Sequence, residues 1–184
     1  LLRETRMKEK SGLEISSLNG RLHMDSTSLH VSELSLHTPD SYLGAQAHMD
    51  FSAVGPHPHG SLSARLMGEL GKQDVLLFAG GLPMAFVRSY PNEPIIVRLS
   101  ADGNLDSLNL TTAEARLAGA FELKADGRLR QLTDSVRMSG DINLDLRTQN
   151  LNFVKTLAGP GAMKDIALPP MHLTGKAGMY GRQY

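Results

Sequence analysis

The 184-residue chain carries no formal net charge, no cysteine and no tryptophan, and 41% of its residues are hydrophobic. Balanced charge removes the simplest electrostatic basis for binding nucleic acid or an acidic membrane surface, and the lack of cysteine excludes thiol catalysis and disulfides. No apolar run approaches the roughly 20 residues that a membrane-spanning helix needs, so we predict no transmembrane segment. Alternation begins in Met171–Tyr184 and stops, so we expect the chain to be a single fragment cut from a longer one.

Alternating apolar residues predict a first sheet region over residues 11–67. The apolar positions change parity at Ser16–Ser17 and at Ser32–Glu33, and later at Asp106–Ser107 and Arg130–Gln131. A change of parity turns the apolar set to the wrong face unless the chain bulges or turns there. Because none of these pairs contains the Gly or Asn that two-residue hairpins favour, we favour bulges in curled strands over hairpins.

The period changes in a helical insertion over residues 68–92. One short helix is predicted over Lys72–Ala79, where Gly80–Gly81 ends it. A second is predicted over Met84–Tyr90, where Pro91 stops it. The apolar content of these helices fits either a membrane-surface element or a cap over one end or edge of the sheet, and we favour the cap.

Alternation resumes in a second sheet region over residues 93–148. The last segment, residues 149–184, contains a short helix over Leu151–Ala158, preceded by Asn150 as a candidate N-cap, and the start of further strands. The fold class is therefore all-β with minor short helices. We expect an elongated curled sheet or an incompletely closed barrel with an apolar interior.

The apolar positions of the predicted strands share one face, which one sheet cannot bury alone. A second sheet, folding of the sheet over itself, or a ligand must cover it. Small residues such as Ala45 and Gly119 fit a close approach of two sheets and an open groove equally well. The candidate groove lining is Leu13, Ile15, Leu22, Met24, Leu29, Val31, Leu34, Leu36, Leu43, Met49, Phe51, Leu99, Leu105, Leu108, Leu110, Leu117, Phe121, Leu123, Leu129, Met138, Ile142, Leu144 and Leu146.

The residue types that could act in catalysis or bind a metal lie on the other face. His23, His30, His37 and His48 have the parity opposite to their apolar neighbours, which favours solvated side chains over the converging ligands of a metal site. The carboxylates fall at turns or on the polar face, and no nucleophile elbow or phosphate-binding loop is present. We therefore predict no enzyme activity, no metal and no cofactor.

Four stretches of the chain, residues 18–29, 71–83, 89–95 and 103–110, resemble an internal segment of the TamB translocation and assembly module family. The resemblance is to its Bacteroidetes branch, within the AsmA-like group of bridge-like lipid-transfer proteins. It implies a long periplasmic protein anchored in the inner membrane, with an open, apolar-lined β-structure called a β-taco. It also implies roles in phospholipid movement toward the outer membrane and in outer-membrane protein assembly, with a barrel partner bound through other regions.

Three hypotheses follow for the chain. The first is a segment of a hydrophobic groove that carries phospholipid acyl chains. The alternative is a chaperone-like scaffold that holds outer-membrane β-strands by strand addition. A third is a passive β-sandwich spacer, which would have a fully packed core.

Overall fold

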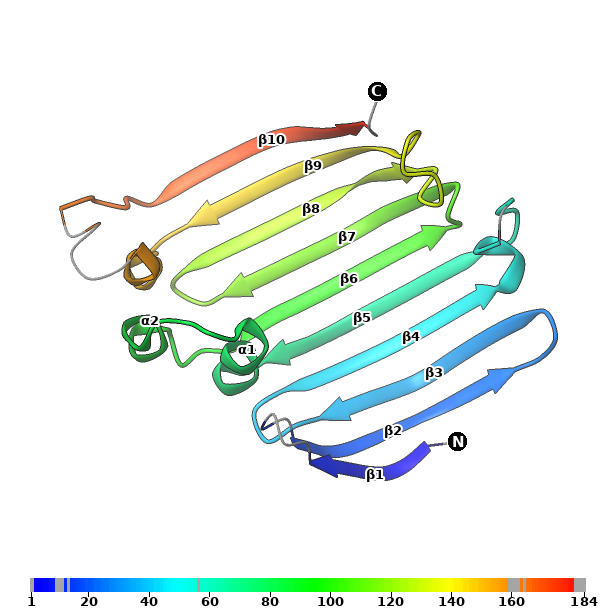
Figure 1. The fold of residues 1–184 in the computed structure, drawn as a ribbon, viewed down its shortest axis with the longest axis horizontal. Coiled ribbons are helices and arrows are strands. Elements are labelled where there is room, and N and C mark those ends of the chain that lie inside the picture. Colours follow the sequence, from blue (N-terminus) through cyan, green and yellow to red (C-terminus); the bar gives the residue numbers. More distant parts are fainter. Residues whose placement is uncertain are drawn as a thin grey trace.

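The computed structural model describes residues 2–8, 12, 14–55, 57–158, 163 and 165–180. Within them the chain forms a ten-stranded antiparallel sheet in which each strand pairs with its neighbours in chain order (Figure 1). The strands are β1 (Leu2–Lys8), β2 (Glu14–Met24), β3 (Ser28–His37), β4 (Tyr42–Asp50), β5 (Leu62–Leu70), β6 (Ile95–Gly103), β7 (Ser107–Leu117), β8 (Phe121–Arg130), β9 (Ser139–Thr148) and β10 (Met171–Tyr180). Strands β1 and β10 form opposite edges, so the sheet is open. The predicted class, a curled and unclosed all-β sheet with minor helices, is confirmed.

Two of the four parity changes are β-bulges, as predicted. Between Val31 and Leu34, β3 advances three residues while β4 advances two, and Glu33 adopts a left-handed φ of 55°. The extra residue keeps Val31 and Leu34 on the same side of the sheet despite their opposite parity. The change at Ser16–Ser17 in β2 lies at a similar register shift against β1.

The other two parity changes are chain reversals, and the prediction of bulges was wrong there. Between β6 and β7, Asn104 Oδ1 accepts hydrogen bonds from the backbone N–H of Asp106 (3.0 Å) and of Ser107 (2.9 Å). This side chain builds a turn by itself, and it stands two residues before the change of parity. After β8, Gln131 adopts a φ of 54° and leads into a loop.

A further bulge lies in β7, where the alternation did not locate one. Between Leu110 and Ala113, β7 advances three residues while both β6 and β8 advance two. Bulges increase the local twist of a sheet. The bulges in β2, β3 and β7 therefore explain how the sheet curls while its apolar and polar residues stay on separate sides.

Small residues in the strands mark close approach of neighbouring strands. Gly127 in β8 has a φ of 158°, and a Cβ atom there would lie 2.1 Å from the backbone oxygen of Asp141 on β9. A Cβ atom on Gly68 in β5 would lie 2.2 Å from the backbone oxygen of Tyr42 on β4. Across the described residues all strands belong to one sheet. These glycines therefore fit adjacent strands of that sheet rather than a second sheet.

Short helices gather at one end of the strands (Figure 1). They are α1 (Lys72–Ala79), α2 (Met84–Ser89) and the 3-10 helix η2 (Asn152–Ala158), close to the predicted ranges. Another 3-10 helix, η1 (Phe51–Ala53), lies at the opposite end. A buried cluster joins α2 to the sheet and comprises Phe86, Tyr90, Leu117 and Ala120, with Ile95, Phe121 and Phe153 packed against it. The helices thus cover one end of the sheet, as the predicted cap requires.

A buried carboxylate fixes α1 to the turn between β3 and β4. Asp74 accepts hydrogen bonds from the hydroxyls of Thr38 and Ser41, and the Ser41 hydroxyl in turn accepts one from the backbone N–H of Gly71. Lys72 Nζ donates to the backbone oxygen of Tyr90 at 2.7 Å. These polar contacts act together with the apolar cluster to hold the two helices in place.

Candidate functional site

Strand register collects apolar side chains on one side of the sheet from β2 to β10. Residues directly opposite each other on paired strands point to the same side. One such row runs through Val97, Ala115, Leu123, Leu146 and Leu173, on β6 to β10 in turn. We call this side the apolar face.

Most of the predicted groove residues lie on the apolar face. The bulges in β2, β3 and β7 bring residues of both parities to it. The residues placed there are Ile15, Leu22, Met24, Leu29, Val31, Leu34, Leu36, Leu43, Met49, Leu99, Leu108, Leu110, Leu117, Phe121, Leu123, Leu129, Ile142, Leu144 and Leu146.

Three predicted lining residues lie outside the strands. Phe51 begins η1, because its backbone N–H donates to Thr27 in the β2–β3 turn instead of continuing the β4 ladder. Leu105 lies in the β6–β7 turn, and Met138 lies in the loop before β9. The prediction that the strands continue through these three residues was wrong. Hydrogen bonds of turns and loops replace the hydrogen bonds between neighbouring strands there. A fourth residue, Leu13, lies outside the described residues.

The structure adds apolar residues that the predicted lining omitted. Strand β5 contributes a full alternating set, and its pairing with β4 and β6 places that set in the middle of the apolar face. Strand β10 extends the face to the far edge of the sheet. In both segments, the alternation of apolar and polar residues was the sequence signal that could have identified these additional lining residues. The added residues are Leu18, Leu62, Leu66, Leu70, Ile95, Val97, Met171, Leu173 and Met179.

Among the described residues no second sheet covers the apolar face: most of its side chains are half-buried, and several are exposed. Leu22 is 53% exposed, Met24 66% and Leu173 54%, and buried apolar side chains in the described chain are Ala53 and the helix-capped cluster. The accessible surface is 12103 Å², well above the roughly 8,700 Å² expected of a compact monomer of about 20 kDa. A Leu side chain left exposed forgoes about 1.5–3 kcal/mol of burial. The face is therefore a large surface with unused hydrophobic free energy.

The opposite side, which we call the polar face, is lined by charged and hydroxyl side chains. Cross-strand ion pairs include Arg98–Glu114 at 3.3 Å and Arg130–Asp141 at 3.1 Å. Exposed pairs of this kind contribute about 0–1 kcal/mol each. Their main effect is to keep this side hydrated, so the two faces differ sharply in polarity.

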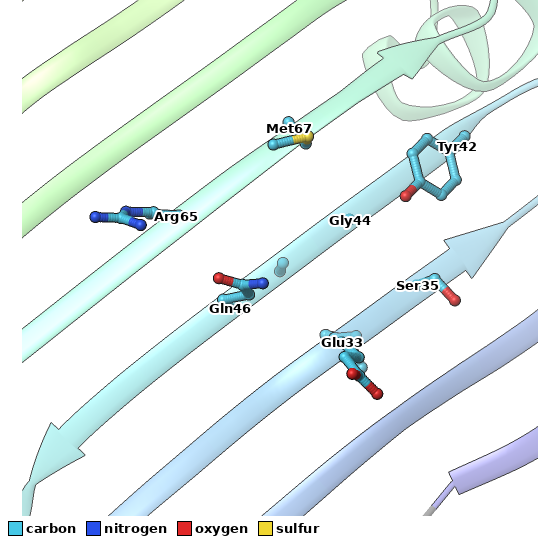
Figure 2. Close-up of a pocket in the computed structure, with 9 residues that line it drawn as sticks. Glu33, Ser35, Tyr42, Gly44, Gln46, Arg65 and Met67 are labelled. Atoms are coloured by element: carbon cyan, nitrogen blue, oxygen red, sulfur yellow. The ribbon is translucent and has the colours of Figure 1, made fainter.

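The polar face carries a hollow of about 380 Å³ across β3, β4 and β5. Figure 2 shows Tyr42 and Met67 at one end of it and Gln46 and Arg65 at the other, with Gly44 between them. The hollow exists because Gly44 lacks a side chain, and a Cβ atom there would lie 2.9 Å from the Tyr42 hydroxyl oxygen. Its lining offers hydrogen-bonding groups but does not bring together a pair of carboxylates or a nucleophile with a base.

Asp25 and Asp50 are carboxylates with lowered pKa values whose hydrogen bonds stabilise turns or loops. Backbone N–H groups of Thr27 and Ser28 and the Thr27 hydroxyl donate to Asp25, and they hold the pKa of that carboxyl well below its usual range. Asp50 is held in the same way by the backbone and hydroxyl of Ser61, which lower its pKa. Both pKa values are therefore lowered by hydrogen bonds within turns or loops of the fold.

No group of three or more histidines and carboxylates in the described part of the chain is arranged to hold a metal ion. Among the same residues, no helix has both the length and the apolar character to cross a bilayer. Comparison of the chain with protein-family models, curated proteins and solved structures yields no match. The apolar face is thus the feature on which a functional proposal rests.

Proposed function

We propose that this chain is a segment of a hydrophobic groove that carries phospholipid acyl chains through the periplasm toward the outer membrane. The observation that supports this most is the apolar face, which runs unbroken across nine strands in register and remains open to solvent. The opposite face is polar, so water is tolerated on one side and acyl chains on the other. The resemblance to the TamB family supports the periplasmic setting and the anchoring of the full-length protein in the inner membrane.

Acyl chains gain free energy on such a surface without specific contacts. Burial contributes about 0.8 kcal/mol per methylene group, and this gain adds up along a chain. Branched and flexible side chains such as Leu22, Met24 and Leu173 provide a surface that moves with the lipid. No individual residue is required, which fits a conduit better than a binding pocket.

A passive sandwich spacer fits the fold less well. It requires a second layer that packs over the apolar face. In the residues that the structure describes, all strands belong to one sheet, and the helical cap covers one end of that sheet. The groove hypothesis accounts for an uncovered surface, and the spacer hypothesis does not.

Lipid extraction tests the proposal directly. The chain is purified without detergent, and its bound lipids are identified by native mass spectrometry and by solvent extraction. We expect copurified phospholipid at a defined ratio to protein. A lipid-free chain that also fails to take up fluorescent phospholipid from vesicles would contradict the proposal.

Charges placed on the apolar face should abolish lipid carriage without unfolding the sheet. Leu144→Arg is suited to this because Leu144 is 38% exposed, and Leu123→Asp tests a neighbouring strand. The matched control is Asn143→Arg, which adds the same charge one residue away on the polar face, where Asn143 already contacts Asp126. We expect lipid transfer between vesicles to be lost in the first two variants and kept in the control, with unchanged circular dichroism in all three.

A second candidate function is a scaffold that binds outer-membrane β-strands by strand addition. Its support is β10, whose residues are all exposed and which pairs with β9 alone among the described strands. An open edge of this length is a template for an added strand. Photo-crosslinkers at Leu173 and Thr174 separate the two functions, because lipid adducts favour the groove and peptide adducts favour the scaffold.

A further inference from the structure

Two histidine side chains meet on the polar face, away from the apolar face. His30 on β3 and His48 on β4 lie directly opposite each other. Their ring centroids are 4.2 Å apart, and their Nδ1 atoms are 3.2 Å apart. His23 on β2 lies opposite His30, so histidines occupy three neighbouring strands at the same level.

The separation of the two nitrogens matches shared coordination of one ion. Imidazole nitrogens bind Zn²⁺ at about 2.0–2.1 Å, and two such nitrogens on a tetrahedral ion lie about 3.3 Å apart. Without an ion, one Nδ1 of the pair carries a proton and donates it to the other. An ion can take the place of that proton when each ring turns so that its Nδ1 lone pair points beside the line between the two nitrogens, because a neutral imidazole can carry its proton on Nε2 instead.

Asp50 sets the orientation of His48. Its Oδ1 lies 3.3 Å from His48 Nε2, while its Oδ2 accepts hydrogen bonds from the backbone N–H and the hydroxyl of Ser61, both at 2.7 Å. An ionised carboxylate at this place holds the ring proton on Nε2, so the lone pair of Nδ1 points toward His30. A carboxylate behind a histidine is the usual outer partner of a metal-bound imidazole.

We propose that His30 and His48 form a surface site for a divalent transition-metal ion, with Asp50 as the orienting carboxylate. Water completes the coordination, since the described residues offer no third converging ligand there. Imidazole ligands suit Cu²⁺, Ni²⁺ and Zn²⁺, and the general order of affinity places Cu²⁺ above Zn²⁺. The site lies on the side of the sheet opposite the proposed lipid groove and does not depend on that function.

Titration of the tag-free chain with Cu²⁺ and with Zn²⁺ tests the site. Calorimetry should show one equivalent bound with Cu²⁺ tighter than Zn²⁺, and the electron paramagnetic resonance spectrum of the Cu²⁺ complex should show coupling to two nitrogens. His30→Ala and His48→Ala should each abolish this binding within the range titrated. Asp50→Asn should weaken it about 10–100-fold, with the thermal midpoint of the ion-free variant checking that the turn survives.

Two controls use the other histidines of the chain. His57→Ala/His59→Ala removes the histidines of the loop before β5, and His172→Ala removes one on β10 that contacts Asp145. Both controls should bind Cu²⁺ like the unmodified chain. The proposal is overturned if His30→Ala and His48→Ala bind as before, if the loop variant loses the ion instead, or if no equivalent binds at all.

Discussion

At the scale of single residues, Asp74 shows how a polar group stabilises a fold with little buried apolar surface. Its carboxylate joins α1 to the β3–β4 turn through Thr38 and Ser41, and it is 8% exposed. Removal of such an acceptor leaves two hydroxyls without their partner in a place that water reaches poorly.

Asp74→Ala should therefore lower the free energy of unfolding by about 1–3 kcal/mol. Urea denaturation followed by circular dichroism measures the change. The control is Glu93→Ala, an exposed carboxylate in the loop after α2, which should change the free energy of unfolding by less than about 0.5 kcal/mol. Equal effects of both substitutions would contradict the assigned role of Asp74.

The turn between β2 and β3 depends on the charge of Asp25. Because hydrogen bonds lower its pKa in the folded chain, below the unfolded value of about 3.9, the ionised group stabilises the fold above that pH. This contribution is lost as the pH falls through the folded-state pKa.

Asp25→Asn should accordingly be less stable than the unmodified chain at pH 7, and the difference should shrink as the pH falls below about 4. Urea denaturation from pH 7 to pH 3 measures it, with Asp165→Asn, outside every strand and helix, as the control. A difference that stays constant over this range would show that the charge of Asp25 is not responsible.

At the scale of elements, the helical cap and the sheet have different sources of stability. The cap depends on an aromatic cluster, in which the ring of Phe86 lies 5.7 Å from those of Tyr90 and Phe153. The strands depend on ladder hydrogen bonds between neighbours. Loss of the cluster should therefore affect the helices more than the strands far from them.

Phe86→Ala should cost the cap about 3–5 kcal/mol. Hydrogen exchange should then become faster in α1, α2 and η2 and stay unchanged in β3 and β4. The control is Phe78→Ala on α1, because Phe78 is 74% exposed and its truncation removes little packing. Faster exchange throughout the sheet would contradict the separation of cap and sheet.

The alternation of apolar and polar residues predicted which residues share a face of the sheet. It could not distinguish a bulge within a strand from a turn between two strands. The slips at Ser32–Glu33 and Asp106–Ser107 have similar local patterns, yet the first is a bulge and the second follows a turn built by Asn104. The decisive side chain, Asn104, lies outside the two residues at which the parity changes. Likewise, the solvated position of His30 followed from parity, but its distance from His48 depends on strand register, which parity does not determine.

At the scale of the whole molecule, the accessible apolar face predicts that lipid stabilises the fold. A ligand that binds the folded chain and not the unfolded chain raises the thermal midpoint by mass action. A short-chain phosphatidylcholine below its micellar concentration should raise that midpoint in proportion to the logarithm of its concentration. Glycerophosphocholine, which has the same headgroup without acyl chains, should leave it unchanged, and a shift with the headgroup alone would argue against an acyl-chain site.

The strict agreement between strand order and chain order has a consequence for synthesis and for evolution. Because each strand among the described residues pairs only with its neighbours in sequence, a hairpin can fold as soon as it leaves the ribosome, without waiting for distant segments. Gain or loss of one hairpin changes the width of the sheet by about 10 Å and leaves the other pairings intact. The width of such a sheet is then set by the number of hairpins its gene encodes, much as the length of a solenoid is set by its repeats.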